Sequence, residues 1–161
     1  MVKPNNLRKV SIARLKQEMQ DTVFLSDDLA ITTIDYLRNP TSEIPVSLDG
    51  FAAMIMMSGS AVLSIDTETY EVRPNMLVFF RPGSIIRTIR CSSDATAYLV
   101  ACSKAFVSDI QVDISASLPI HMRFGRKPCL QVTERDVAEI RQFFQLIKTV
   151  IQSDKERYRK E

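Results

Sequence analysis

The sequence predicts a mainly β protein, a small antiparallel sandwich or barrel, that ends in a long helix. Turn signals separate short β-prone runs through the middle of the chain, as at Asp49-Gly50, Ser58-Gly59, Pro74-Asn75 and Pro82-Gly83. Short strands joined by such closely spaced turns are typical of antiparallel sandwiches and barrels. From Thr133 onward the apolar residues instead follow the spacing of an amphipathic helix.

We expect the barrel strands between Val46 and Cys102. In Ala61–Ile65 the odd-numbered apolar residues alternate with Val62 and Ser64, which indicates a strand with one buried face. The run Met76–Phe80 is almost entirely apolar, so it should be covered on both faces. Arg81–Ser84 fits a type II turn, because its proline presets φ at the second position and its glycine accepts a positive φ at the third.

The segments on either side carry weaker patterns. Ser11–Gln20 has apolar residues at helical spacing and Leu29–Arg38 is rich in β-branched residues, so a short helix and a strand are expected. Ser103–Gln111 should form another short helix, and Ser115–Pro128 an irregular connection. The predicted organisation is an N-terminal arm with a short helix (1–25), the barrel (26–128) and a C-terminal helical region (129–161).

The C-terminal helix has more apolar surface than one contact needs. Thr133 is the expected N-cap, and Asp136 three residues later completes a capping box. Two adjacent stripes follow, a first stripe of Val137, Ile140, Phe144, Ile147 and Ile151 and a second of Phe143, Leu146 and Val150. Together they cover about half of the helix circumference. This predicts one contact with the barrel and one with another helix or a second subunit, and we assign the dimer contact to the first stripe. The alternative is a single wide packing face in a monomer.

Composition and charge exclude several classes. The 161 residues suit one domain, and 21 basic against 19 acidic residues leave a net charge of +2, too balanced to predict nucleic-acid binding by these residues alone. No apolar run approaches the roughly 20 residues that a membrane span needs, and the N-terminus lacks a signal peptide. Three cysteines without a CxxC motif favour a reduced, cytoplasmic setting.

Enzymatic chemistry also lacks its usual residues. A metal site in a small barrel needs several converging His and carboxylate ligands, but the chain has one histidine, His121, and none between Met56 and Phe80. We therefore expect no metal, no cofactor and no enzymatic activity. Arg87 and Arg90 have opposite strand parity, so they should point to opposite faces of the sheet.

Two segments of the sequence resemble a known family. The strand that runs into Ser58-Gly59, and the segment from Tyr70 through Pro74-Asn75 to the Pro82-Gly83 turn, resemble the cupin sensor domain of AraC-family bacterial transcription regulators. Asn75 stands where the family usually has glycine, and asparagine also accepts that turn geometry. The resemblance implies a cupin-like double-stranded β-helix, or jelly-roll barrel, with a C-terminal helix that makes the family's dimer contact.

The resemblance also implies a function. The chain would be the regulatory half of a transcription regulator, which senses an effector and forms a homodimer. DNA would be bound only by a C-terminal part with two helix-turn-helix units, which these residues do not contain. No helix stop signal follows Pro128, so we expect the native chain to continue past Glu161.

The ligand is not identified by the residues. Positions comparable to the family's ligand-lining ones are Met54, Met56, Ser58, Ile86, Thr88 and Tyr98. They lack the fixed polar groups that a sugar site needs. Three interpretations stay open: an apolar or amphipathic ligand, a filled barrel without ligand, or a site between barrel and helices. Two alternative functions also stay open, a metal-free small cupin enzyme and a stand-alone binding module.

Overall fold

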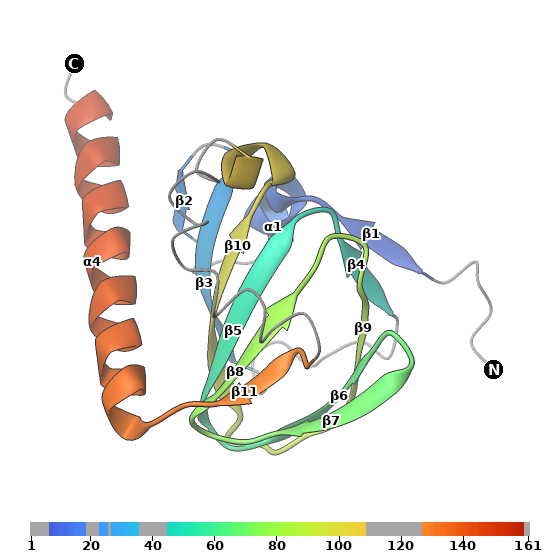
Figure 1. Cartoon of the computed structure of the whole chain (residues 1–161). Coiled ribbons are helices and arrows are strands. Elements are labelled where there is room, and N and C mark those ends of the chain that lie inside the picture. Colours follow the sequence, from blue (N-terminus) through green and yellow to red (C-terminus); the bar gives the residue numbers. More distant parts are fainter. Residues whose placement is uncertain (1–6, 19–22, 26, 36–44, 109–126, 160–161) are drawn as a thin grey trace.

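The computed structural model describes residues 7–18, 23–25, 27–35, 45–108 and 127–159. Two facing sheets form the barrel, and a long helix stands beside one of them (Figure 1). The first sheet has the order β1 (Arg8–Val10), β4 (Val46–Leu48), β9 (Ile85–Cys91), β6 (Ala61–Ile65) and β7 (Glu68–Val72). The second has the order β11 (Cys129–Gln131), β8 (Met76–Phe80), β5 (Phe51–Ser58), β10 (Thr96–Cys102), β3 (Leu29–Asp35) and β2 (Val23–Leu25). This mainly β architecture with a C-terminal helix confirms the predicted fold class.

The core lies between the two sheets. Ala61, Leu63 and Ile65 are buried while their even-numbered neighbours are half-buried, so the predicted alternation of β6 is confirmed. In β8, Val78 and Phe80 are buried and the residues between and before them are half-buried, so its second face is only partly covered. Because β8 is paired on both sides, with β11 and β5, its backbone needs no solvent even where its outer side chains reach it.

The barrel sheets extend beyond residues 26–128. The first sheet gains β1, which pairs in parallel with β4, and the second gains β2 at one edge and β11 at the other. Each added strand has three residues, too few for a period of two to be visible in the sequence. The boundaries of the three regions stay predictions. The last residues of the strand expected as far as Arg38 and of the helix expected as far as Gln111, and most of the connection expected from Ser115, lie outside the described part.

The predicted helices are found where the structure describes them. Helix α1 spans Ile12–Glu18, and its first turn is closed by Ser11 Oγ, which accepts from the backbone N–H of Arg14 at 3.2 Å. Residues 104–108 are helical, and Ser103 Oγ caps that turn through the N–H of Phe106. Within the described ranges, no helix is long and apolar enough to span a membrane.

Helix α4 (Glu134–Arg159) begins with the predicted capping box. Thr133 Oγ1 accepts from the N–H of Asp136 at 3.1 Å, and the Asp136 carboxylate accepts from the N–H of Thr133 at 3.0 Å. This exchange satisfies two backbone donors that would otherwise have no partner at the helix start. It also fixes the residue at which α4 leaves the barrel.

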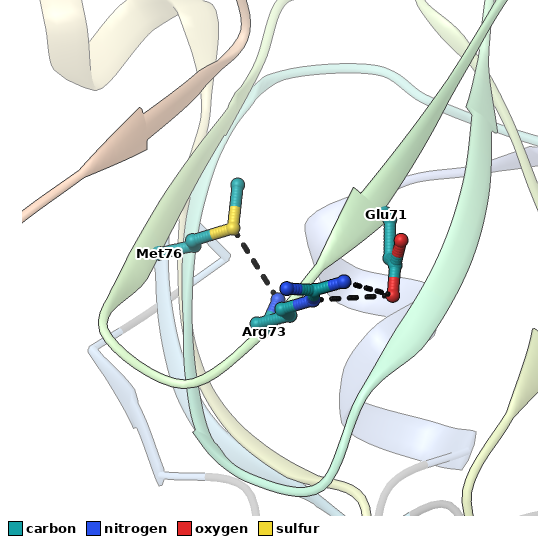
Figure 2. A network of polar contacts seen from close by, with 3 residues as sticks. All are labelled: Glu71, Arg73 and Met76. Carbon is teal, nitrogen blue, oxygen red and sulfur yellow. Dashed lines mark hydrogen bonds and ion pairs between the residues drawn. The ribbon is translucent and has the colours of Figure 1, made fainter.

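The turn Arg73–Met76 links the barrel to the start of α4. Asn75 has a φ of 66°, and the N–H of Met76 bonds the carbonyl of Arg73, which confirms that asparagine supplies the turn geometry expected of glycine. In the same turn the Arg73 guanidinium bonds Glu71, and the Arg73 N–H points at the sulfur of Met76 (Figure 2). The Asn75 carbonyl accepts from Val132 N–H at 2.8 Å, so the turn holds the chain just before the helix.

A β-bulge corrects the expected placement of two arginines. The pairing of β6 with β9 shifts between Val62 and Leu63, so Arg87 lies opposite Ser64 and Arg90 lies opposite Val62. Residues that face each other across a ladder share a side of the sheet. Arg87 and Arg90 therefore lie on the same outer face, because the extra residue of the bulge reverses the parity between them.

Candidate functional site

The barrel interior is filled by apolar side chains. Met56, Leu63, Val72 and Val78 keep at most 2% of their surface exposed, so they are almost fully enclosed by other side chains. Met54 belongs to the same cluster and is 2% exposed. Both methionines that were expected to line a ligand are therefore core residues of the barrel.

Ser58 has a structural role at the end of β5. Its hydroxyl lies 2.8 Å from the carbonyl oxygen of Asp94 and 2.6 Å from the hydroxyl of Thr96, to which it is hydrogen-bonded. The next residue, Gly59, has a φ of 68°, and a Cβ there would lie 2.7 Å from the backbone nitrogen of Ala95. The Ser58-Gly59 pair thus fits the β5–β6 turn closely against the loop before β10.

The other expected positions are divided between two places. Ile86 packs against the barrel core, and half-buried Thr88 lies opposite buried Leu63. Tyr98 points the other way, because Ala97 and Ala101 occupy the inward face of β10. Its ring stacks on Phe144 with a centroid distance of 4.8 Å and an angle of 18°. The six predicted ligand residues therefore do not form one site.

The first stripe of α4 packs on the second sheet of its own barrel. Phe144 and Ile151 are buried in one cluster with Ile31 of β3, and Val137 is also buried. Ile140 and Ile147 are half-buried on the same side, and Ile147 joins that cluster. The prediction that this stripe makes the dimer contact thus gains no support, because these side chains would have to leave the barrel to reach a second subunit.

The second stripe is the one that remains uncovered. Phe143, Leu146 and Val150 are 65%, 60% and 51% exposed, although all three are large apolar residues of one helix face. They lie at i, i+3 and i+7, the spacing at which one helix packs against another. The sequence had revealed both stripes but not which of them meets the barrel.

Two surface hollows lie outside the filled interior. One, of about 340 Å³, lies between Asn75 and the first turns of α4, where Glu134, Val137 and Arg141 line it. The other, of about 560 Å³, lies at the opposite end of the barrel, between β1, α1 and the Pro82-Gly83 turn. Both are lined by polar as well as apolar residues, so each is a place where a ligand could contact the barrel and a flanking element together.

The titratable groups of the described residues offer little for catalysis. Burial raises the pKa of the Cys102 thiol, and it raises the pKa of Cys129 to about 11, so both thiols are poor nucleophiles. A hydrogen bond to Glu68 raises the pKa of Tyr70 to about 12. In the part of the chain that the structure describes, no three His, Cys, Asp or Glu side chains gather to hold a metal ion, and His121 lies outside that part.

Comparison with known families identifies the domain. The sequence matches the AraC-like ligand binding domain over residues 41–160. The chain belongs to this family. The match includes β4 to β11 and α4, the elements that build the barrel and its helix, and it confirms the resemblance seen in the sequence.

Solved structures show weaker likeness. A protein of unknown function from Streptococcus pyogenes is 28% identical over 64% of this chain and 96% of its own, with a TM-score of 0.41. A cupin superfamily protein from Desulfitobacterium hafniense is 11% identical over 52% and 74%, with a TM-score of 0.39. Bacillus subtilis oxalate decarboxylase is 16% identical over 58% and 24%, also at 0.39. A search among curated proteins found no relative.

Proposed function

We propose that this chain is the effector-sensing and dimerisation domain of a bacterial transcription regulator, with the DNA-binding part lying outside these residues. Family membership supports a regulatory, ligand-binding role. The observation that carries the dimerisation part is the division of α4 into a face buried on the barrel and a face of three exposed apolar residues. The proposed role is non-enzymatic and cytoplasmic.

The second stripe is the proposed dimer contact. Two α4 helices that meet through Phe143, Leu146 and Val150 would remove large apolar surface from water, and each square ångström is worth about 25 cal/mol. The first stripe then stays on the barrel. The sequence predicted two apolar contacts, and this arrangement keeps both. It assigns the barrel contact to the first stripe and the dimer contact to the second.

The effector acts outside the barrel interior in this proposal, since apolar side chains fill that interior. An effector that binds between the barrel and α1 or α4 would change how that element packs, and the paired DNA-binding parts would then be reoriented. Such coupling requires the effector to bind the two arrangements with different affinity. The hydrogen bond that joins Asn75 to Val132 is one route from the barrel to the start of α4.

Sedimentation velocity tests the dimer contact. We expect the unaltered chain to sediment as a dimer at micromolar concentration and the double variant Phe143→Asp/Leu146→Asp as a monomer with an unchanged circular dichroism spectrum. The matched control is Gln152→Asp, an exposed residue that helix geometry places on a different side of α4. A dimer that persists in the double variant, or a monomeric parent chain, would contradict the proposal.

A further inference from the structure

The hollow of about 560 Å³ at the end of the barrel is built from segments that are distant in sequence. It is lined by residues of β1 and the start of α1, by the Pro82-Gly83 turn and Lys104, and by Ser47 and Leu48 of β4, both buried. Strand β1, helix α1 and strand β4 lie near one another at this end (Figure 1).

The charges around this hollow are strongly unequal. Lys9, Arg14 and Lys104 line it from three different elements, and Asp49 is the one carboxylate among the lining residues. Lys104 Nζ lies 3.0 Å from Asp49 Oδ1, but both side chains are mostly exposed. Such an exposed pair contributes about 0–1 kcal/mol, so an anion can compete with the carboxylate for the ammonium group.

The size of the hollow indicates what kind of anion fits. Pockets for small organic ligands measure roughly 300–1,000 Å³. A volume of about 560 Å³ lies within that range and exceeds what a bare inorganic anion would fill. Half-buried Pro82 gives the uncharged part of a ligand an apolar contact.

We propose that this hollow binds a small organic anion that carries phosphate or carboxylate groups, held by Lys9, Arg14 and Lys104. One part of the inference, that such an anion is the effector, rests on the proposed function. The binding itself is a property of the described residues. The anion contacts β1 and α1 on one side and β4 on the other, so it bridges the N-terminal elements and the barrel.

Isothermal titration calorimetry with defined probes tests the site. We expect glucose 6-phosphate or citrate to bind at low ionic strength and uncharged glucose not to bind. Binding of glucose 6-phosphate alone identifies the phosphate group as the recognised chemistry, and binding of citrate alone identifies carboxylates. The affinity should fall as salt is added, because the contacts are charged. If neither anion gives a binding isotherm at millimolar concentration, the inference is overturned.

Matched variants separate a built site from general surface charge. The double variant Lys9→Gln/Lys104→Gln should weaken binding at least about tenfold, since hydrogen bonds to charged groups are the strong ones. The control Lys127→Gln/Arg135→Gln removes the same charge at exposed positions outside the hollow and should leave the affinity within about twofold. Asp49→Asn should tighten binding, because it removes the competing carboxylate. An equal loss in both double variants would contradict the site.

The two proposals fail separately. If the anion binds and sedimentation shows no dimer, the site stands and the regulator proposal falls. If the chain dimerises through the second stripe and neither anion binds, the regulator proposal stands and the site falls. Thermal melts of every variant should overlay that of the parent chain, so that a lost isotherm reports lost binding rather than unfolding.

Discussion

Two neighbouring phenylalanines of α4 have opposite environments. Phe144 is 5% exposed and stacks on Tyr98 of the barrel, whereas Phe143 is 65% exposed. Consecutive helical residues point about 100° apart, so one turn of helix can serve two surfaces. The comparison shows that apolar content alone does not reveal which face of a helix packs on its own domain. Which face packs depends on the barrel residues that lie against the helix, here Ile31, Tyr98 and Val100 of the second sheet.

In the described part of the chain, the exposed apolar face of α4 has no covering residues, whereas the buried face packs on the barrel. Single exposed apolar residues are common on protein surfaces, but three large ones in helical register form a stripe that another helix can cover. The barrel face stabilises the fold of one chain, and the outer face is the proposed contact between two chains. Substitutions on the two faces should therefore change different observables.

The largest expected effect comes from Phe144→Ala. Removing a buried phenylalanine ring typically costs about 3–5 kcal/mol, because contacts are lost and a cavity remains. Phe143→Ala should change the unfolding free energy of the monomer by less than about 0.5 kcal/mol. Urea titrations of both variants on a Leu146→Asp/Val150→Asp background, which disrupts the proposed dimer contact and keeps both phenylalanines, measure this difference. Equal losses would mean that the two faces are not distinct.

A smaller loss is expected at the turn that holds the helix start. Asn75 has a positive φ, which costs a residue with a Cβ about 1–2 kcal/mol and a β-branched residue most. Asn75→Val should therefore destabilise the chain by about that amount, and Asn75→Gly should be neutral or stabilising. Thermal unfolding compares the two. If valine is tolerated as well as glycine, the turn does not constrain the entry into α4.

The helix cap should contribute less again. Thr133→Ala removes the side chain that accepts from the Asp136 N–H, and loss of such an N-cap costs about 1 kcal/mol. Thr133→Ser keeps the hydroxyl and is the matched control. Both faces of α4 should loosen together, which amide hydrogen exchange across residues 134–144 would report. Loosening of only one face would contradict a shared helix start.

The smallest effect is a pH dependence at the same cap. Hydrogen bonds from Thr133 lower the pKa of Asp136 below its ordinary value of 3.8. A carboxyl group whose pKa is lowered by folding stabilises the fold at pH values above its unfolded pKa, and this stabilisation is lost as pH falls through the folded pKa. Asp136→Asn should therefore differ from the parent chain at pH 6, and the difference should shrink below pH 3.8 as the pH passes through the lowered folded pKa. A constant difference down to pH 2 would contradict the assignment.

Much of the fold could be predicted from the sequence because its signals are local. The strand alternation of Ala61–Ile65, the Pro82-Gly83 turn and the Thr133–Asp136 capping box each depend on a few consecutive residues, and each was confirmed. The resemblance to the family, carried by Pro74-Asn75 and its surroundings, was also confirmed.

The sequence-based errors concern which way a side chain points. In β10 apolar residues occupy both parities, so Tyr98 was placed with the barrel interior although it faces α4. The parity of Arg87 and Arg90 depends on a bulge in β9, where Ile89 is the extra residue, and the bulge becomes visible only in the pairing of β9 with β6. The hollow beside β1 could not be predicted from the sequence, because its lining residues are spread between positions 9 and 104 and meet only in the fold.

Disulfide cross-linking tests the central claim, the division of labour between the two faces of α4, most directly. Leu146 lies in the middle of the second stripe, so two copies of Leu146→Cys should lie near the symmetry axis, within the roughly 7 Å between Cα atoms that a disulfide allows. Gln152→Cys is the matched control, and the parent chain reports any background from its own free thiols, Cys91, Cys102 and Cys129. The account predicts a reducible covalent dimer for Leu146→Cys and little for Gln152→Cys. Equal cross-linking of both, or of neither, would contradict it.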